Sequence, residues 1–279
     1  MLATRILTAL VLVPLTLAAL LLLPPREWAA ASLAVIVVAA AEWANLVGYR
    51  RPAWLLFVGG TLGIGAVLLF GEAAGFDRGW PDRVAFAVCG AATVFWALGA
   101  PLWLRYRWRP SAGIAMALVG WLVLIGAWVA LVELQARSPR LALAAMAIVW
   151  IADTAAYFAG RAFGRRKLAP AISPGKTWEG VYGALAAVAA YALALAPYAR
   201  DAGYGGSVAA GPTVAWVVLA LALTGLSICG DLLESLLKRH AGVKDSGRLL
   251  PGHGGILDRT DALLAAMPAA ALAALVFLR

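Results

Sequence analysis

Apolar residues fall along the chain in blocks of about 20, the length at which an α-helix crosses the hydrocarbon core of a bilayer. Nine such blocks are present, separated by short polar or charged segments. They are residues 6–23, 28–48, 54–71, 84–104, 113–132, 141–160, 179–198, 213–232 and 262–278. The pattern predicts an all-α fold, a polytopic transmembrane helical bundle with about nine spans.

The first block begins like a signal peptide, because Arg5 precedes an apolar run. The run continues to Leu23, which is too long for a cleaved signal, and Pro24, Pro25 and Arg26 follow it instead of small residues. We therefore expect an uncleaved first span.

The composition also indicates a chain that lies mostly in lipid. Hydrophobic residues make up 63% of the 279 residues and charged residues 13%, whereas soluble domains are about half apolar and a quarter charged. A net charge of +9 would suggest nucleic-acid binding in a soluble protein. Here the basic residues lie in short loops, so no nucleic-acid partner is expected. Cys89 and Cys229 each lie inside an apolar block and indicate neither a disulfide framework nor a metal site.

Lysine and arginine are distributed unequally between alternate loops, which indicates orientation in the membrane. The N-terminus and the second, fourth, sixth and eighth loops hold 16 of these residues, and the other side holds 7. Because basic loops face the cytoplasm, we expect a cytoplasmic N-terminus and an external C-terminus. The charge-rich loops 161–178 and 233–261 are then cytoplasmic, where nucleotides are found.

Polar residues divide the chain into two parts. Residues 1–140 are predicted to be scaffold helices with possible dimer contacts, and for their main polar intrusion, Glu42, we favour a structural hydrogen bond within the bundle. Residues 141–279 are predicted to be the catalytic region, because acidic residues interrupt or flank three spans on one side of the membrane. Carboxylates at mid-membrane cost about 2.5–3.5 kcal/mol on insertion scales. Their retention favours a shared polar cavity, and solvation of helix ends is the alternative.

The densest polar segment begins with Asp231, Glu234, Ser235 and Lys238. Their spacing places them on one face of a helix. Carboxylate oxygens suit a hard cation such as Mg²⁺, and basic side chains suit phosphates.

A glycine-rich turn follows, with Gly252, Gly254 and Gly255 ahead of a predicted helix. Exposed backbone amides in such a turn can hold phosphate oxygens. Asp258 and Asp261 follow it and share a helix face. This pattern predicts a metal–polyphosphate site, and a basic loop with an ordinary glycine turn is the alternative.

The segment 175–177 reads Gly-Lys-Thr but is not a P-loop, because a proline stands where the motif needs its first glycine. We interpret Ser173 as an N-cap and Pro174 as the first residue of the seventh span. Lys176 and Thr177 then lie at the positive end of a helix, where anions bind.

Two further features belong to the same region. Asp153 and Tyr157 are four residues apart on the sixth span, so both are predicted to line the cavity, as direct ligands or behind them. For the basic cluster 165–167, membrane orientation with attraction to anionic lipids and phosphate binding are equally open.

Segment 235–261 resembles the signature of the phosphatidate cytidylyltransferase family at every constrained position. These positions are Ser235, Leu236, Leu237, Lys238, Arg239, Lys244, Asp245, Gly247, Leu250, Pro251, Gly252, His253, Gly254, Gly255, Ile256, Asp258, Arg259, Thr260 and Asp261. Segments 173–180 and 153–161 resemble two further motifs of this family, so the strong matches cover roughly residues 150–262.

This resemblance implies that the phosphate of phosphatidic acid attacks the α-phosphorus of CTP, giving CDP-diacylglycerol and pyrophosphate. It also implies Mg²⁺, with K⁺ as a possible second cation, and a homodimer. In the family, metal-binding aspartates match Asp231 and Asp258. We expect a multi-pass protein of the bacterial cytoplasmic (inner) membrane, with its active site on the cytoplasmic side.

The residues and the resemblance together give three groups of site residues. The catalytic group is Lys238, Arg239, Lys244, Asp245, His253 and Arg259. The substrate-binding group is Asp153, Tyr157, Ser173, Lys176, Thr177, Glu179, Ser235, Gly254 and Gly255. The metal group is Asp231, Asp258 and Asp261. For His253, phosphate contact, proton transfer and a purely structural place in the turn all stay open.

Three alternative functions stay open. A CTP-dependent kinase of polyprenols or other lipids, or a cytidylyltransferase for an ether lipid, would use similar loops. An ion-coupled transporter could also carry intramembrane acids, but transporters often show two matching halves, whereas the polar residues here gather in one half.

Overall fold

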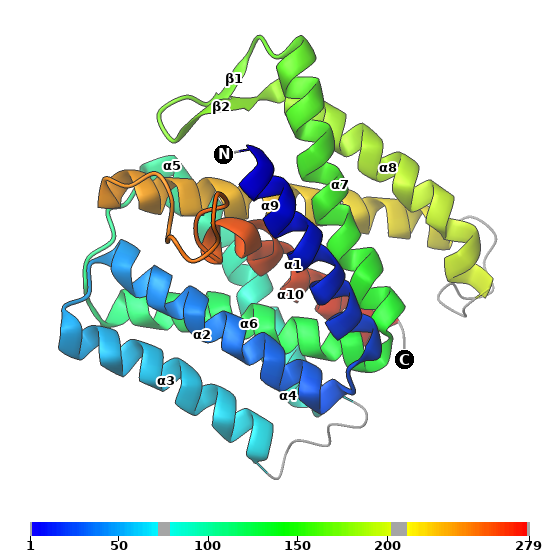
Figure 1. Cartoon of the computed structure of the whole chain (residues 1–279). Coiled ribbons are helices and arrows are strands. Elements are labelled where there is room, and N and C mark those ends of the chain that lie inside the picture. The colour runs from blue at the N-terminus through cyan, green and yellow to red at the C-terminus, as the bar shows by residue number, and fades with distance from the viewer. Residues whose placement is uncertain (1, 72–78, 202–210, 278–279) are drawn as a thin grey trace.

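The computed structural model describes residues 2–71, 79–201 and 211–277, and these residues are mostly helical (Figure 1). The helices are α1 (Leu2–Leu22), α2 (Pro25–Val47), α3 (Arg51–Phe70), α4 (Asp82–Val94), a π-helical turn (Phe95–Gly99), α5 (Ala100–Tyr106), α6 (Ile114–Arg137), α7 (Pro139–Phe163), α8 (Trp178–Asp201), α9 (Gly211–Ala241) and α10 (Leu257–Phe277). Two short strands, β1 (Lys167–Ala169) and β2 (Ser173–Thr177), lie between α7 and α8.

The predicted spans are confirmed as apolar helices. Within the described residues, eight helical segments are long and apolar enough to cross a membrane, with α4, the π-helical turn and α5 forming one continuous segment, Asp82–Tyr106. The first predicted block lies in α1, whose apolar part, Leu10–Leu22, is shorter than the others. The protein is therefore a polytopic helical membrane protein.

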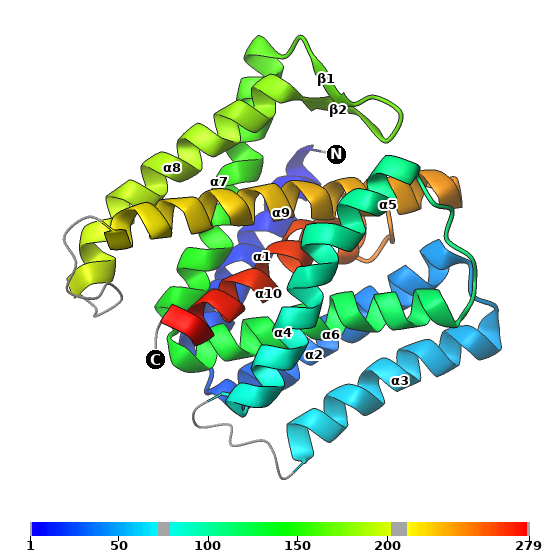
Figure 2. The same ribbon diagram turned by 180° about the vertical axis from the view of Figure 1, so that it is seen from behind.

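Helix α10 lies in the middle of the bundle, where it packs against α9, α6 and α4 (Figure 2). Its sequence is rich in alanine, and alanines such as Ala265, Ala266 and Ala271 are buried. Small residues let neighbouring helices approach closely in a membrane. A Cβ atom at Gly230 of α9 would lie only 2.5 Å from the carbonyl oxygen of Asp261. The beginning of α10 is thus held directly against the polar face of α9.

In the N-terminal half, α2 and α6 are joined by indole groups that donate hydrogen bonds to main-chain carbonyls of the other helix. Trp128 of α6 donates to Ala29 of α2 at 3.0 Å, and Trp28 of α2 donates to Leu131 of α6 at 3.3 Å. Near this end of α6, the buried carboxylate of Glu133 accepts bonds from Arg137 Nε at 2.6 Å and from the amide of Trp80 at 3.0 Å. These contacts lie near the first residues of α2.

Helices α7 and α8 pack along each other and carry a β-hairpin at one end (Figure 1). Strands β1 and β2 pair antiparallel, with Lys167 opposite Thr177 and Ala169 opposite Ser173. The expected N-cap at Ser173 is therefore wrong, because Ser173 and Pro174 belong to a strand and α8 begins only at Trp178. A residue before proline avoids the helical region of the backbone, and Ile172, in the turn of the hairpin, is buried. This hairpin is a local exception to the all-α prediction in the described part of the chain.

Candidate active site

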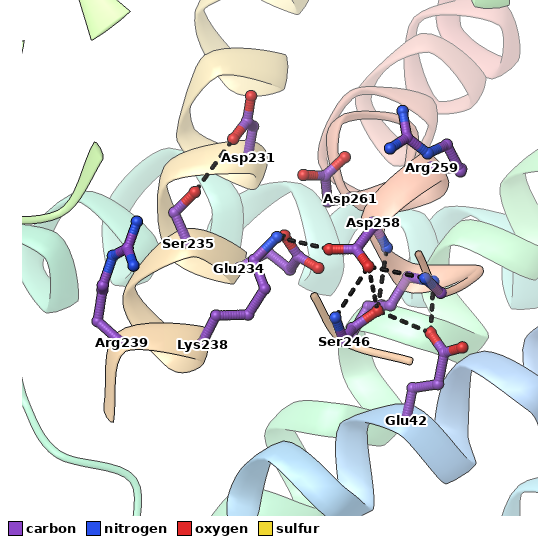
Figure 3. Close-up of polar contacts among 12 residues, drawn as sticks. Glu42, Asp231, Glu234, Ser235, Lys238, Arg239, Ser246, Asp258, Arg259 and Asp261 are labelled. Carbon is purple, nitrogen blue, oxygen red and sulfur yellow. Dashed lines mark hydrogen bonds and ion pairs between the residues drawn. The ribbon is translucent and has the colours of Figure 1, made fainter. Parts of the chain in front are cut away.

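The polar face of α9 has the arrangement that its spacing predicts (Figure 3). Ser235 Oγ donates to Asp231 Oδ1 at 3.3 Å, one helical turn away. Lys238 forms an ion pair with Glu234, which is buried, and a second with Asp258 Oδ1 of α10 at 2.6 Å. The ammonium group of Lys238 therefore joins the carboxylates of two helices. Glu234 is outside the three predicted groups, although its place on the polar face is visible in the sequence.

Asp258 organises the loop that precedes its own helix. Its Oδ2 atom accepts bonds from the amides of Ser246 and Gly255, both at 2.8 Å, and lies 3.0 Å from Ser246 Oγ. Gly254 has a φ of +84°, and a Cβ there would lie 2.6 Å from Asp258 Oδ2. Glycine is needed at this position for its backbone angle and for the close approach of the carboxylate.

Glu42 of α2 reaches the same loop from the other half of the chain. Its carboxylate accepts bonds from the amides of Ile256 at 3.0 Å and Leu257 at 2.7 Å, and from Ser246 Oγ at 2.9 Å. The predicted structural hydrogen bond of Glu42 is confirmed, but its partners belong to the loop 246–257, called the active-site loop below. No local signal in the sequence could identify a contact across more than 200 residues.

The β-hairpin brings Lys176 to the polar face of α9. Lys176 Nζ lies 2.5 Å from Asp231 Oδ2, and both side chains are partly exposed. Beside this pair, Arg239 Nε donates to the carbonyl of Ile172 at 3.2 Å, which holds the hairpin against α9. Asp153 on α7 interacts electrostatically with Lys176 and Asp231, so it faces the same space.

Three predicted substrate residues also have structural contacts. Thr177 is buried and its Oγ1 atom accepts a bond from the amide of Gly180 at 3.2 Å, so it caps the beginning of α8. The Glu179 carboxylate accepts bonds from the amides of Arg165 at 3.0 Å and Arg166 at 3.2 Å, which holds the base of the hairpin. Tyr157 is exposed, and its hydroxyl accepts a bond from Arg161 at 3.0 Å. Substrate contact by Thr177, Glu179 and Tyr157 stays a prediction.

A pocket of about 630 Å³ opens beside Asp258, within the range of about 300–1,000 Å³ that ligand pockets usually have. Its charged lining consists of Lys244, Arg248 and Arg259 together with the carboxylate of Asp245, and His253 also lines it. The other lining residues are Gly247, Leu250, Pro251, Gly252 and Gly254. Basic side chains outnumber the acidic one, so the pocket suits an anion such as a phosphate.

The turn around His253 is held by a main-chain hydrogen bond and by the side chain of Arg259. The amide of Leu250 donates to the carbonyl of Gly254 at 2.9 Å, and Arg259 Nε donates to the carbonyl of His253 at 3.0 Å. Gly252 has a φ of +75°, a conformation that glycine adopts without strain. These contacts fix the main chain at one edge of the pocket, and the role of the His253 ring stays a prediction.

The three predicted metal ligands are close together, but lysines bind two of them. Asp231 pairs with Lys176 and Asp258 with Lys238, and the described residues contain no group of three or more His, Cys, Asp or Glu arranged to hold a metal. Asp261 on α10 lies across from Asp231 on α9 (Figure 3), and its Oδ1 atom accepts only from the amide of Ala262, at 2.8 Å, among described partners. Oxygen ligands of this kind suit Mg²⁺. The donor chemistry of Asp231 and Asp261 therefore fits the cation.

A helical bundle that holds a cationic pocket beside carboxylates at the end of its spans has the chemistry of a membrane enzyme acting on phosphate compounds. Comparison with known proteins gives the family. A model described as "Cytidylyltransferase family" matches residues 3–277. The chain therefore belongs to the cytidylyltransferase family, and the resemblance seen in its motifs is confirmed.

Curated relatives match the chain over nearly its whole length. A phosphatidate cytidylyltransferase of Pseudomonas aeruginosa is 42% identical over 285 residues, which cover 96% of this chain and 95% of that protein. The corresponding protein of Haemophilus influenzae is 35% identical, with 96% of each chain covered. That of Brucella suis is 39% identical, covering 95% of this chain and 90% of the relative.

Proposed function

We propose that this protein transfers the cytidylyl group of CTP to phosphatidic acid, forming CDP-diacylglycerol and pyrophosphate. The structural observation that carries this proposal is the cationic pocket of Lys244, Arg248 and Arg259 beside the Lys238–Asp258 ion pair. Its location at the end of the spans allows the acyl chains of phosphatidic acid to stay in lipid while the headgroup reaches the nucleotide.

The reaction needs charge neutralisation more than it needs a strong base. A phosphate oxygen of phosphatidic acid forms a new bond to the α-phosphorus of CTP, and the bond from that phosphorus to the oxygen bridging to the β-phosphate breaks. The pyrophosphate keeps the electron pair of the broken bond. A phosphomonoester has a second pKa of about 6, so the attacking oxygen is already anionic near neutral pH. The two polyanions repel each other, and basic residues placed around them lower the barrier.

The described residues suggest how this charge is placed. Lys244, Arg248 and Arg259 line the pocket, where they would bind phosphate oxygens. Lys238 is oriented by Glu234 and Asp258, so its ammonium group has a fixed direction. These basic groups would stabilise the negative charge that develops on the leaving pyrophosphate.

Mg²⁺ is part of the proposal. Asp231 and Asp261 would hold it, because they lie across from one another on α9 and α10 (Figure 3). Asp231 would exchange its ion pair with Lys176 for the cation, whereas Asp258 is also held by Lys238 and two loop amides. When bound, the cation would neutralise charge on the polyphosphate. A second cation, K⁺, and a homodimer are supported by the family resemblance alone.

The site is proposed to face the cytoplasm of a bacterial inner membrane. The side that carries loops 161–178 and 233–261 holds 16 of the 23 basic residues, and basic loops are retained on the cytoplasmic side. CTP is available on that side. The orientation of the N-terminus in the cytoplasm belongs to the same proposal.

Label transfer tests the reaction directly. Purified protein in detergent is supplied with phosphatidic acid, Mg²⁺ and CTP labelled either at the α-phosphate or at the γ-phosphate. We expect α-label in the lipid and release of pyrophosphate. Transfer of the γ-label to lipid would identify a kinase, and no transfer by folded protein would contradict both enzyme functions and favour a transporter. An ether-lipid acceptor supplied in competition tests the lipid specificity.

A further inference from the structure

A buried carboxylate from the N-terminal half lies directly beneath the active-site loop. Glu42 is on α2 and only 6% of it is exposed, yet its three hydrogen-bond partners among the described residues all belong to residues 246–257. The first 140 residues therefore supply a polar group to the site formed by the rest of the chain.

Glu42 and Asp258 share the hydrogen-bond donors of this loop. Glu42 accepts hydrogen bonds from the amides of Ile256 and Leu257, which lead into α10. Asp258 accepts hydrogen bonds from the amides of Ser246 and Gly255. Amides at the beginning of a helix have no partner within the helix and form a positive end that attracts carboxylates. Two acidic side chains are thus held at the beginning of one helix.

The hydroxyl group of Ser246 connects the two carboxylates. Its Oγ atom lies 2.9 Å from Glu42 Oε2 and 3.0 Å from Asp258 Oδ2. A hydroxyl has one proton to donate, so the two carboxylates share a single donor. A shift of Glu42 would change the bonding of Ser246 and, through it, the position of Asp258 and its partner Lys238.

The backbone of the loop also packs tightly against Glu42. A Cβ atom at Gly247 or at Gly255 would lie under 3.0 Å from the Glu42 carboxylate oxygens. Real Cβ contacts of that length essentially do not occur. These two glycines let the loop close over the carboxylate, which explains Gly255 without requiring that it bind substrate.

From these contacts we propose that Glu42 is a positioning residue of the active site, which fixes the loop 246–257 and thereby holds Asp258 and Lys238 in place. The catalytic part of this inference rests on the proposed function, whereas the ordering of the loop can be measured without it. Glu42 touches no reacting atom in this assignment.

Glu42→Gln is the variant that tests the proposal. The Glu42 oxygens accept from two backbone amides and a hydroxyl, so either orientation of a carboxamide would direct its NH₂ group at a donor. The matched control is Glu133→Gln, which also removes a buried carboxylate from the N-terminal half. Glu133 lies far from the loop. Trp28 of α2 contacts Leu131, which is near Glu133 on α6, and Trp28 is 14 residues before Glu42 on the same helix, or about 20 Å at 1.5 Å per residue.

Two measurements are made on each folded, purified variant. In label transfer, Glu42→Gln should lower kcat by about 100-fold, the size of effect that a small misplacement of catalytic groups produces, with a much smaller change in KM for CTP. In hydrogen–deuterium exchange without substrates, its amides at 244–257 should exchange faster, with little change in α4 and α6. Glu133→Gln should keep kcat within about threefold of wild type, after correction for folded protein, and leave exchange at 244–257 unchanged.

Ser246→Ala supplies a second variant that tests the connection if Glu42→Gln yields little folded protein. Its kcat should also fall, and the double variant should lose little more than the larger single loss, because both changes interrupt one connection. The proposal is overturned by unchanged exchange at 244–257 in Glu42→Gln, by normal kcat in that variant, or by normal kcat in Ser246→Ala. If wild-type protein forms no CDP-diacylglycerol, the proposed function fails, while the exchange data still decide whether Glu42 orders the loop.

Discussion

At the residue scale, Lys238 is the cation on which the arrangement of α9 and α10 depends. It joins Glu234 and Asp258, and its removal would leave two buried carboxylates without their shared partner. We expect Lys238→Gln to lower kcat at least 100-fold in label transfer, a typical result of removing one group that stabilises developing charge. Arg140→Gln is the control, because Arg140 is exposed at the beginning of α7. Retention of more than a tenth of wild-type kcat by folded Lys238→Gln would contradict this role.

The carboxylate of Asp231 provides the residue-scale test of metal binding. We expect Asp231→Asn to raise the Mg²⁺ concentration for half-maximal activity at least about tenfold, because an amide oxygen carries no charge and binds a hard cation more weakly. The measurement is a Mg²⁺ titration of label transfer at saturating CTP. Asp82→Asn is the control, since Asp82 forms a 3.5 Å ion pair with Arg137 in the N-terminal half. Identical Mg²⁺ curves for Asp231→Asn and wild type would remove Asp231 from the metal site.

At the scale of elements, the active site depends on the close approach of α9 and α10. A methyl group at Gly230 would meet Asp261 and Ala265 of α10, with the carbonyl oxygen of Asp261 only 2.5 Å away. We expect Gly230→Ala to separate the two helices next to Asp231, at a cost of about 1–3 kcal/mol in stability and with a clear loss of kcat. Gly225→Ala on the same helix is the control, because nothing lies within 4 Å of its Cβ position. Thermal unfolding and label transfer check both variants. Equal stability and equal kcat of the two variants would show that activity does not depend on the close contact at Gly230.

The elements also show why sequence predicts some features and not others. The spans were predictable because a bilayer imposes both a length and an apolar composition on every helix that crosses it. The polar face of α9 was predictable because helical periodicity alone sets it. The hairpin was not, because strand pairing and the burial of Ile172 depend on contacts outside the segment. The link from Glu42 to Ser246 was hidden for the same reason, since 204 residues separate the two partners.

At the scale of the whole molecule, the two parts of the chain contribute to one bundle. Helix α10 of the C-terminal part packs against α4 and α6 of the N-terminal part, and Glu42 bonds to the loop before it. Division into a scaffold, 1–140, and a catalytic region, 141–279, stays a prediction about roles. In space the site is completed by both parts, because one of the two carboxylates that hold the loop, Glu42, comes from residues 1–140.

The number of crossings decides where the ends of the chain lie, which gives the last prediction. If α1 crosses the membrane, eight crossings separate the N-terminus from the loop 242–256, and both are on one side. If α1 does not cross, seven crossings place them on opposite sides.

We expect Leu249→Cys, which is in this loop at a position 58% exposed, to resist an impermeant maleimide in intact bacterial cells and to react after permeabilisation. An N-terminal tag should be cytoplasmic and an alkaline phosphatase fused to the C-terminus should be active. A cytoplasmic loop with an external N-terminal tag would show that α1 does not cross, whereas an external loop would reverse the orientation inferred from the basic residues.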